Sequence, residues 1–346
     1  MHYHPSISTS GLNAAQDVNR YWSLASGGSL ALGTYTPTFS WAASGDTNGT
    51  LVTSALQVKR YASSAWTSPS STSTYAAGPP PSETATSYST TFGDYAVGNS
   101  TATELSISAI TPVSPAAGAS FSVTVQAQDA LHNASSVTSD TLVTLTRTSG
   151  SGTLGGTLTG TILNGTGSVT ITGVTYTKSE SVQLTATATS GMSLTASTST
   201  FTVVAGTPSR LQVLLPGETA APGTATGKTG TPTDATAGTA VTDIIVRATD
   251  ANWNLTTATP TVAITSSDGY ATLPANRTLV SGTATFSVTF KTGNGYQDVI
   301  ATDTAASGAL NPGSSTQVTV NAGAATKLQV LMPGESAVPG SATGKT

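Results

Sequence analysis

The chain has 346 residues, enough for two or three domains that each bury a core. Only 8% of the residues are charged, against about 25% in an average soluble domain, whereas 68 Thr and 46 Ser make a third of the chain hydroxyl-bearing. The net charge of −4 and the scattered Lys and Arg argue against nucleic acid and anionic membranes as partners. No apolar run approaches the length of a transmembrane helix, so we expect no membrane insertion. The absence of cysteine excludes disulfides and thiolate metal sites.

The first 99 residues hold most of the aromatic side chains. The segment YTPTFSW, residues 35–41, alternates ring and small residues, which predicts a strand with its rings in a core. A carbohydrate-binding face is the alternative for these rings. We predict a β-sandwich over residues 1–99, in which only residues 11–17 suggest a turn of helix. The rings concerned are Tyr21, Trp22, Tyr35, Phe39, Trp41, Tyr61 and Trp66.

From residue 100 onward the sequence alternates apolar residues with Thr, Ser or Gln, which is the pattern of half-buried strands. Clusters of Gly, Asn, Asp and Pro separate these stretches and predict turns. We therefore predict an all-β fold of tandem antiparallel immunoglobulin-like sandwiches arranged end to end. The predicted strands cover residues 120–128, 141–146, 167–174, 181–189, 199–206, 283–290 and 316–323.

The sequence also repeats. AGASFSVTVQAQDALHN (117–133) parallels AGTAVTDIIVRATDANWN (237–254), and LQVLLPGETAAPGTATGKT (211–229) returns as LQVLMPGESAVPGSATGKT (328–346) with 15 of 19 positions identical. The repeats predict domains at 100–206 and 207–323, followed by the first strand and loop of an incomplete unit at 324–346. Short linkers are expected near residues 97–102 and 205–209, which would give a rod. The second repeat contains a Pro- and Gly-rich insertion at residues 216–230, which predicts an extended, non-helical loop.

The V-x-A-x-D-x-x-x-N core of each repeat resembles bacterial immunoglobulin-like, invasin-type domains of large secreted and surface proteins. Residues 1–99 look like a separate sandwich module of the same kind of protein. The resemblance implies an extracellular or cell-surface scaffold.

The most regular polar pairs are Asp129 with Asn133 and Asp250 with Asn254. A calcium loop that braces neighbouring domains is one interpretation, but calcium prefers several clustered carboxylates and each loop has one. An Asx turn that caps backbone N–H groups is the favoured interpretation. His132 stands where the other repeat has Trp253, so no acid–base role is expected for it.

The remaining chemical motifs are weak. His2 and His4 are two ligands on a chain end, too few for a metal site. GTATGKT (223–229) misses the spacing of a phosphate-binding loop and lacks the strand–helix context. No Ser/His/Asp constellation qualifies as a triad. We therefore expect no enzyme activity and no cofactor or metal.

Two functional classes remain. The first is a structural subunit of an extracellular bacterial filament or surface fibre, with copies of itself as partners and host surfaces, biofilm surfaces or glycans as further candidates. The second is a non-catalytic spacer of a larger secreted enzyme or adhesin, or a glycan-binding module.

Residues 328–332 predict the start of a strand with Leu328, Val330 and Met332 on one face and Leu331 on the other. An unpaired apolar strand is a template for association. Either the polypeptide continues beyond residue 346, or the strand docks on a neighbouring subunit and polymerises the chain head to tail. The start of the chain lacks a leader pattern, so either a leader has been removed or Met1 is internal to a longer chain. We favour the filament.

Overall fold

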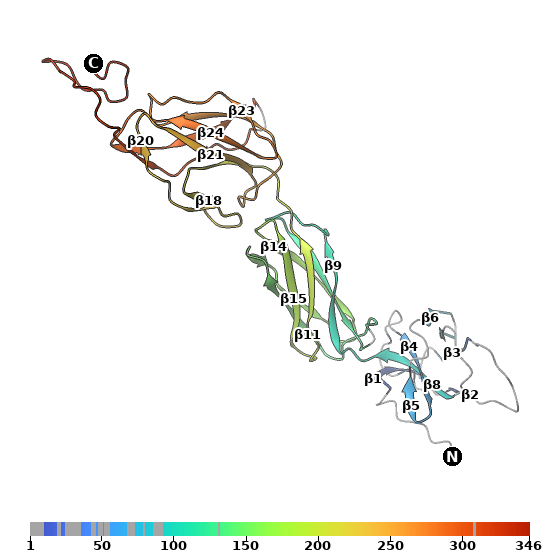
Figure 1. Ribbon diagram of the computed structural model, residues 1–346. Helices are drawn as coiled ribbons and strands as arrows, with labels where there is room; N and C mark the ends of the chain where they lie inside the picture. Colours follow the sequence, from blue (N-terminus) through green and yellow to red (C-terminus); the bar gives the residue numbers. More distant parts are fainter. Residues whose placement is uncertain are drawn as a thin grey trace.

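The structure, a computed structural model, describes residues 93–130, 132–306 and 309–346. Before residue 93 it describes 10–18, 22–24, 36–42, 46–47, 51, 56–67, 73–78 and 80–85. All regular elements of these residues are strands, mostly in antiparallel sheets, so the predicted all-β class is confirmed. No stretch of the described residues forms a helix of the length and apolarity needed to cross a membrane. Figure 1 shows three groups of sheets in a row, with the C-terminal residues extending beyond the third group.

The first sandwich packs two sheets around Phe39, Trp41 and Tyr95. One sheet has the order β1-β8-β4-β5 with β2 also on β8, and the other has the order β3-β7-β6. The strands are β1 (Leu12–Asp17), β2 (Trp22–Leu24), β3 (Thr38–Ser40), β4 (Leu56–Ala62), β5 (Ala65–Thr67), β6 (Ser73–Ala76), β7 (Ser82–Ala85) and β8 (Gly93–Ser100).

The sequence suggested a turn of helix at residues 11–17, and this prediction is wrong because residues 12–17 form the strand β1. β1 pairs antiparallel with β8, from Leu12 opposite Ser100 to Asp17 opposite Gly98, with a register shift between them. Leu12 is buried, and pairing with β8 gives the backbone of this segment its hydrogen-bond partners. This sheet contact therefore decides the conformation of a segment whose own sequence has no alternation.

The aromatic side chains of the first sandwich divide into two groups. Phe39 and Trp41 are buried, and Trp22 packs with its ring centroid 5.0 Å from that of Phe39. Tyr61 and Trp66, half-buried, form a separate pair with centroids 5.3 Å apart across β4 and β5. The core interpretation holds for the first three rings, whereas Tyr21 and Tyr35 lie outside the described residues.

The second sandwich joins the sheets β12-β14-β10-β9 and β13-β11-β15-β16. β10 alternates buried and half-buried residues along its whole length, as the sequence predicts, and its Val123 and Val125 are fully buried. The strands are β9 (Glu104–Thr111), β10 (Phe121–Gln128), β11 (Thr141–Ser149), β12 (Leu154–Gly156), β13 (Thr159–Ile162), β14 (Ser168–Tyr176), β15 (Ser181–Ser190) and β16 (Ser197–Thr202).

The third sandwich contains the sheets β17-β21-β24 and β23-β22-β26-β27, with smaller sheets β20-β28-β25 and β18-β19. Leu211 and Val213 of β17 and Ile244 and Val246 of β21 belong to its core. The strands are β17 (Arg210–Leu214), β18 (Glu218–Ala220), β19 (Lys228–Gly230), β20 (Ala235–Thr236), β21 (Ala240–Thr249), β22 (Thr261–Ser266), β23 (Arg277–Thr278), β24 (Thr283–Thr289), β25 (Gly295–Gln297), β26 (Val299–Asp303), β27 (Gly313–Ser314) and β28 (Val318–Asn321).

The sandwiches follow one another with little intervening chain. Residues 97–100, expected in a linker, belong to β8, and Val97 is fully buried because it faces the first core. Only residues 101–103 separate β8 from β9. Residues 203–209 separate β16 from β17, and Val204 of this stretch pairs with Ala116. The insertion at 216–230 is non-helical, as expected, and contains the β18–β19 hairpin.

Candidate functional site

The two D-x-x-x-N loops follow equivalent strands, β10 and β21, and each contacts chain that precedes its own sandwich. Gln57 of β4 donates through Nε2 to Asp129 Oδ2 at 2.5 Å. The amide of Gly206, in the stretch before β17, donates to Asp250 Oδ2 at 2.8 Å. These loops therefore lie at the joints between consecutive sandwiches.

Within each loop the carboxylate accepts amide protons in the manner of an Asx turn. Asp129 Oδ1 accepts from the Asn133 amide at 3.0 Å, and Asp250 Oδ1 accepts from the Asn254 amide at 2.9 Å. The fourth loop residue, His132 or Trp253, has a positive φ of 64° or 65°. Such bonds give the local turn its shape. The second carboxylate oxygen of each Asp accepts from Gln57 or Gly206, which lie earlier in the same polypeptide.

Asn254 connects the third sandwich to the second directly. Its Oδ1 accepts from the Ser179 amide at 2.8 Å, and its Nδ2 donates to the Thr177 carbonyl at 3.0 Å. Asn254 is 1% exposed, so these bonds are shielded from water. A hydrogen bond in this position contributes on the order of 1 kcal/mol, and losing one partner leaves the other unsatisfied at a greater cost.

Residues 211–229, which we call the first copy, close the same joint from the other side. The Gly223 amide donates to the Asn252 carbonyl at 2.8 Å, and Thr177 Oγ1 of the second sandwich donates to the Gly223 carbonyl at 3.2 Å. Gly223 has a φ of +82°, and a Cβ there would lie 3.0 Å from Lys178 Cβ. A glycine at this point therefore permits both the turn and the close approach.

The first copy is held in shape by its own polar side chains. Gln212 Nε2 donates to the Gly227 carbonyl at 2.7 Å, and Lys228 Nζ lies 3.0 Å from Glu218 Oε1. Lys228 Nζ also donates to the Val213 carbonyl at 3.4 Å. Glu218 further accepts from the Leu215 amide at 2.9 Å. The lysine that resembled part of a phosphate-binding loop is thus engaged in binding the loop to β17.

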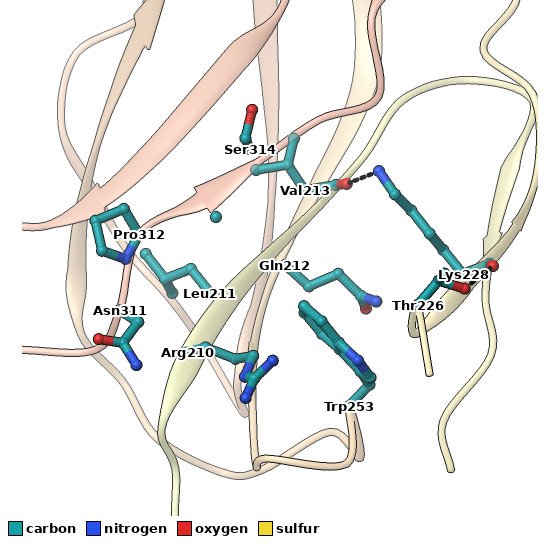
Figure 2. A pocket seen from close by; sticks show the side chains of 11 residues that line it. Arg210, Leu211, Gln212, Val213, Thr226, Lys228, Trp253, Asn311, Pro312 and Ser314 are labelled. Atoms are coloured by element: carbon teal, nitrogen blue, oxygen red, sulfur yellow. Dashed lines mark hydrogen bonds between the residues drawn. The ribbon is translucent and has the colours of Figure 1, made fainter. Parts of the chain in front are cut away.

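Figure 2 shows the hollow between β17 and this loop, with a volume of about 280 Å³, in which Trp253 and Arg210 lie side by side. The Arg210 guanidinium carbon is 4.5 Å from the centroid of the Trp253 ring. The indole Nε1 donates to the Ala225 carbonyl at 3.3 Å, and a Cβ on Gly227 would lie 2.2 Å from Trp253 Cγ. The indole therefore occupies a fitted place between the strand start and the loop, stabilised by a cation–π contact.

Residues 328–346, the second copy, form the same internal bonds. Gln329 Nε2 donates to the Gly344 carbonyl at 2.7 Å, and Lys345 Nζ donates to the Val330 carbonyl at 3.4 Å. Lys345 Nζ is 2.6 Å from Glu335 Oε1, and Glu335 Oε2 accepts from the Met332 amide at 2.8 Å. The fold of this segment is thus encoded locally.

The apolar side chains of the two copies differ completely in exposure. Leu211 and Val213 are each 1% exposed, whereas Leu328 is 101% and Val330 72% exposed. Leu331 and Met332 are 43% and 62% exposed, and residues 328–332 lie in no strand. β17 is a strand because β21 pairs with it from Arg210 to Leu214. Within the described residues, the predicted strand at 328–332 has no such partner.

Each copy contacts a turn of the sandwich that precedes it, and hydrogen bonds to one carboxylate stabilise that turn. Glu180 accepts from the Tyr176 hydroxyl at 2.6 Å and from the Gly152 amide at 2.9 Å. Burial alone would raise its pKa, but these bonds and the Ser151 amide lower the pKa of Glu180 from 4.5 to about 2. This carboxylate therefore stays ionised, and thereby holds its turn, over most of the pH range.

At the next turn the Asp268 carboxylate accepts from the Lys291 and Thr292 amides at 2.6 and 3.0 Å. Burial alone would raise the pKa of Asp268, but the bonds from Thr292, Lys291 and Tyr270 lower it. Thr292 Oγ1 donates to Asp268 Oδ1 at 2.9 Å and lies 3.4 Å from the Pro339 carbonyl, one residue before Gly340, the counterpart of Gly223. The second copy thus contacts a turn of the third sandwich through a threonine hydroxyl, much as the first copy contacts Thr177 of the second sandwich.

The described residues bring together few groups that suit catalysis. No three His, Asp or Glu side chains among them gather as metal ligands do. His132 is 78% exposed and contacts Glu104 through Nδ1. Residues 2 and 4 lie outside the described residues. The geometry of the joints supports a role in connecting sandwiches.

No protein-family profile and no curated protein sequence matches this chain. Among solved structures it is similar to the Yersinia pseudotuberculosis adhesin InvE, at 21% identity and a TM-score of 0.24, over 63% of this chain and 58% of that one. The Escherichia coli adhesin FdeC is similar at 15% identity and a TM-score of 0.28, over 83% and 92%. Domains 5–6 of the S-layer protein SbsC match at 19% identity and 0.21, over 62% and 96%. The chain spans under two thirds of the InvE chain. All three TM-scores lie below 0.5.

Sequence reasoning found the D-x-x-x-N loops but missed their partners across the joint. Thr177, Ser179 and Gln57 belong to other sandwiches, and the bonds to Thr177 and Ser179 involve the backbone. Trp253 and Gly227 both lie in repeated segments, 237–254 and 211–229, so the sequence could have marked each of them as important. Nothing in those segments indicates that the two residues are in contact.

Proposed function

We propose that the chain is a non-catalytic structural segment of an extracellular bacterial filament or surface fibre, with its sandwiches joined in series. One observation carries the proposal: nearly the same 19-residue sequence closes a joint in its first copy and has exposed apolar side chains in its second. An element that makes joints, presented in its folded form, is suited to make another.

We further propose that the second copy docks on a neighbouring subunit, so that the chain assembles head to tail. Leu328, Val330 and Met332 would then be buried as Leu211, Val213 and Leu215 are. Burying a large apolar side chain stabilises a complex by roughly 1.5–3 kcal/mol, and an open strand edge supports pairing by backbone hydrogen bonds. Adhesion to host or biofilm surfaces would be a property of such a fibre.

The proposal is tested by imaging the purified chain with negative-stain electron microscopy and by measuring its sedimentation. The intact chain should form filaments, and deletion of residues 324–346 should leave folded monomers. The paired change Leu328→Asp with Val330→Asp should also abolish assembly. Val280→Asp is the matched control, because Val280 is 70% exposed at the turn between β23 and β24, outside the second copy. Filaments from the deleted chain would refute docking by this segment.

The repetition also favours a second candidate, a non-catalytic spacer in a longer secreted protein. In that case the next sandwich on the same polypeptide would cover residues 328–332. The mass of the native polypeptide separates the two candidates, because a chain much heavier than 34.3 kDa would support the spacer.

A further inference from the structure

The second copy contains a hollow that corresponds, position by position, to the place of Trp253 in the first joint. It lies between residues 327–330 and 341–345. Lys327 stands where Arg210 stands, and Gly344, with a φ of +76°, stands where Gly227 stands at +75°. The structure assigns this hollow as a binding site for the indole of a tryptophan in an Asp-x-x-Trp-Asn loop of a partner strand. A neighbouring subunit would supply its own residues 250–254 by exchanging its first copy for this second copy, and that source of the loop rests on the proposed function.

The hollow is formed before any partner arrives. The Gly344 amide donates to Ser341 Oγ at 3.0 Å, and Ser341 Oγ donates to the Val338 carbonyl at 2.9 Å. In the first copy Thr224 makes the same two bonds at 3.1 and 2.7 Å, so the replacement of Thr by Ser keeps the hydroxyl that shapes the loop. Binding therefore does not need to order this loop, which lowers its entropic cost.

The groups that the indole contacts in the first joint have counterparts in the second copy, but among the described residues no ring lies between them. A Cβ on Gly227 would lie 2.2 Å from the Trp253 ring, whereas the nearest atom to a Cβ on Gly344 is Gln329 Nε2 at 2.9 Å. The Ala225 carbonyl accepts the indole N–H in the first joint, and Ala342 occupies the equivalent position in the second. Among the described residues the Gly340 amide has no partner equivalent to the Asn252 carbonyl that Gly223 contacts.

The charge of Lys327, at the start of the segment that matches β17, favours an indole over an imidazole in the hollow. In the second sandwich this position is Glu104, which contacts His132 of the loop. In the third it is Arg210, which lies over Trp253. Lys327 is a cation, which favours the face of an indole and would oppose a protonated imidazole. The Lys327 position thus fits a loop like that of Trp253 and not one like that of His132.

The strand beside the hollow defines the rest of the partner. In the first joint Val246 lies opposite Val213 and Ala248 opposite Leu211, while Arg247 donates to Gln212 Oε1 at 3.0 Å. Val330, Leu328 and Gln329 repeat those positions. The partner strand should therefore carry Val-Arg-Ala followed by one further residue, Thr249 in the first joint, before its Asp-x-x-Trp-Asn loop.

The test is the binding of a fluorescein-labelled peptide with the sequence of residues 240–256 to the full chain, followed by fluorescence anisotropy. We expect saturable binding that weakens by about tenfold or more when the peptide tryptophan is replaced by alanine, as for aromatic anchors of interfaces. Replacement by histidine should weaken binding similarly. In the chain, Lys327→Glu and Val330→Asp should weaken it, whereas Lys327→Arg and the control Val280→Asp should not.

Absence of binding, or equal binding of the tryptophan and alanine peptides, would overturn the assignment. The assay is run with dilute chain and does not depend on filaments. If filaments form but the peptide does not bind, the indole site is wrong and the proposed fibre stands. If the peptide binds but no filaments form, the site stands and self-assembly is wrong.

Discussion

Residues 211–229 and 328–346 have nearly the same sequence and the same internal hydrogen bonds, yet Val213 is 1% exposed and Val330 is 72% exposed. The polar bonds that the two copies share, from Gln212 or Gln329 to the lysine–glutamate pair, join residues within the segment, and Arg247 and Thr316 add bonds to the first copy from outside it. Burial of the apolar face depends on β21, which lies outside it. The comparison shows that residues within the repeat determine its conformation, whereas its burial in a core depends on a strand outside it.

The largest difference between the copies should appear on placing a charge at matched positions. Val213→Asp would put a carboxylate into the third core and should lower the free energy of unfolding by about 4 kcal/mol or more. Val330→Asp should change it by less than about 0.5 kcal/mol in the monomer, because the side chain already faces water. Chemical denaturation measures both. Equal effects would contradict the idea that only the first copy belongs to a core.

Acid should act on the carboxylates that hold the two supporting turns. Glu180 has a folded pKa of about 2 against an ordinary 4.5, so its stabilisation is present above pH 4.5 and is lost as the pH falls toward 2. The loss should be smaller than the roughly 3 kcal/mol to which the full shift corresponds, because the Glu180 side chain is partly exposed and solvent screens its charge. Thermal unfolding between pH 5 and pH 2 should show it in the native chain and much less in Glu180→Gln. The lowered pKa of Asp268 predicts the same direction, tested with Asp268→Asn. A Glu180→Gln chain with unchanged acid sensitivity would contradict this account.

Alanine substitutions at Gly227 and Gly344 distinguish the cost of a positive φ from the cost of a steric clash with Trp253. Gly227→Ala and Gly344→Ala share the positive φ, which costs roughly 1 kcal/mol for a residue with a Cβ. Only the first meets the Trp253 ring, so it should destabilise the third sandwich by roughly 2 kcal/mol more. Denaturation reports on Gly227→Ala, and hydrogen exchange of the Val338 amide reports on Gly344→Ala. A small effect at Gly227 would mean that Trp253 can move away without loss.

The smallest expected effect concerns the joint. Asn254→Ala removes the bonds to Thr177 and Ser179 and should cost roughly 1–3 kcal/mol. It should also shorten the maximum dimension in X-ray scattering, because the second and third sandwiches would bend freely. Asn133→Ala is the control, since the hydrogen bonds of the Asn133 side chain go to Asp129 in its own loop. An unchanged scattering profile for Asn254→Ala would contradict a stiff joint.

The sequence predicted those features that depend on neighbouring residues. Alternation in residues 120–128 predicted β10, and the copied phrases predicted a loop that would fold alike twice. It failed at residues 11–17, where contact with β8 decides the structure. It also failed to pair Gly223 with Thr177, because that contact joins two sandwiches and involves a carbonyl, which every residue has.

The residue pairs at the joints, Glu104 with His132 and Arg210 with Trp253, are chemically different from each other. Exchanging them would set Glu104 against an indole, whose face repels anions, and would take from Arg210 the indole face over which it lies. Each sandwich is therefore matched to its own strand start and mismatched to that of the other. During folding of a chain with such similar repeats, this selectivity disfavours misassembly between sandwiches, so the order of the domains in space follows their order in the gene.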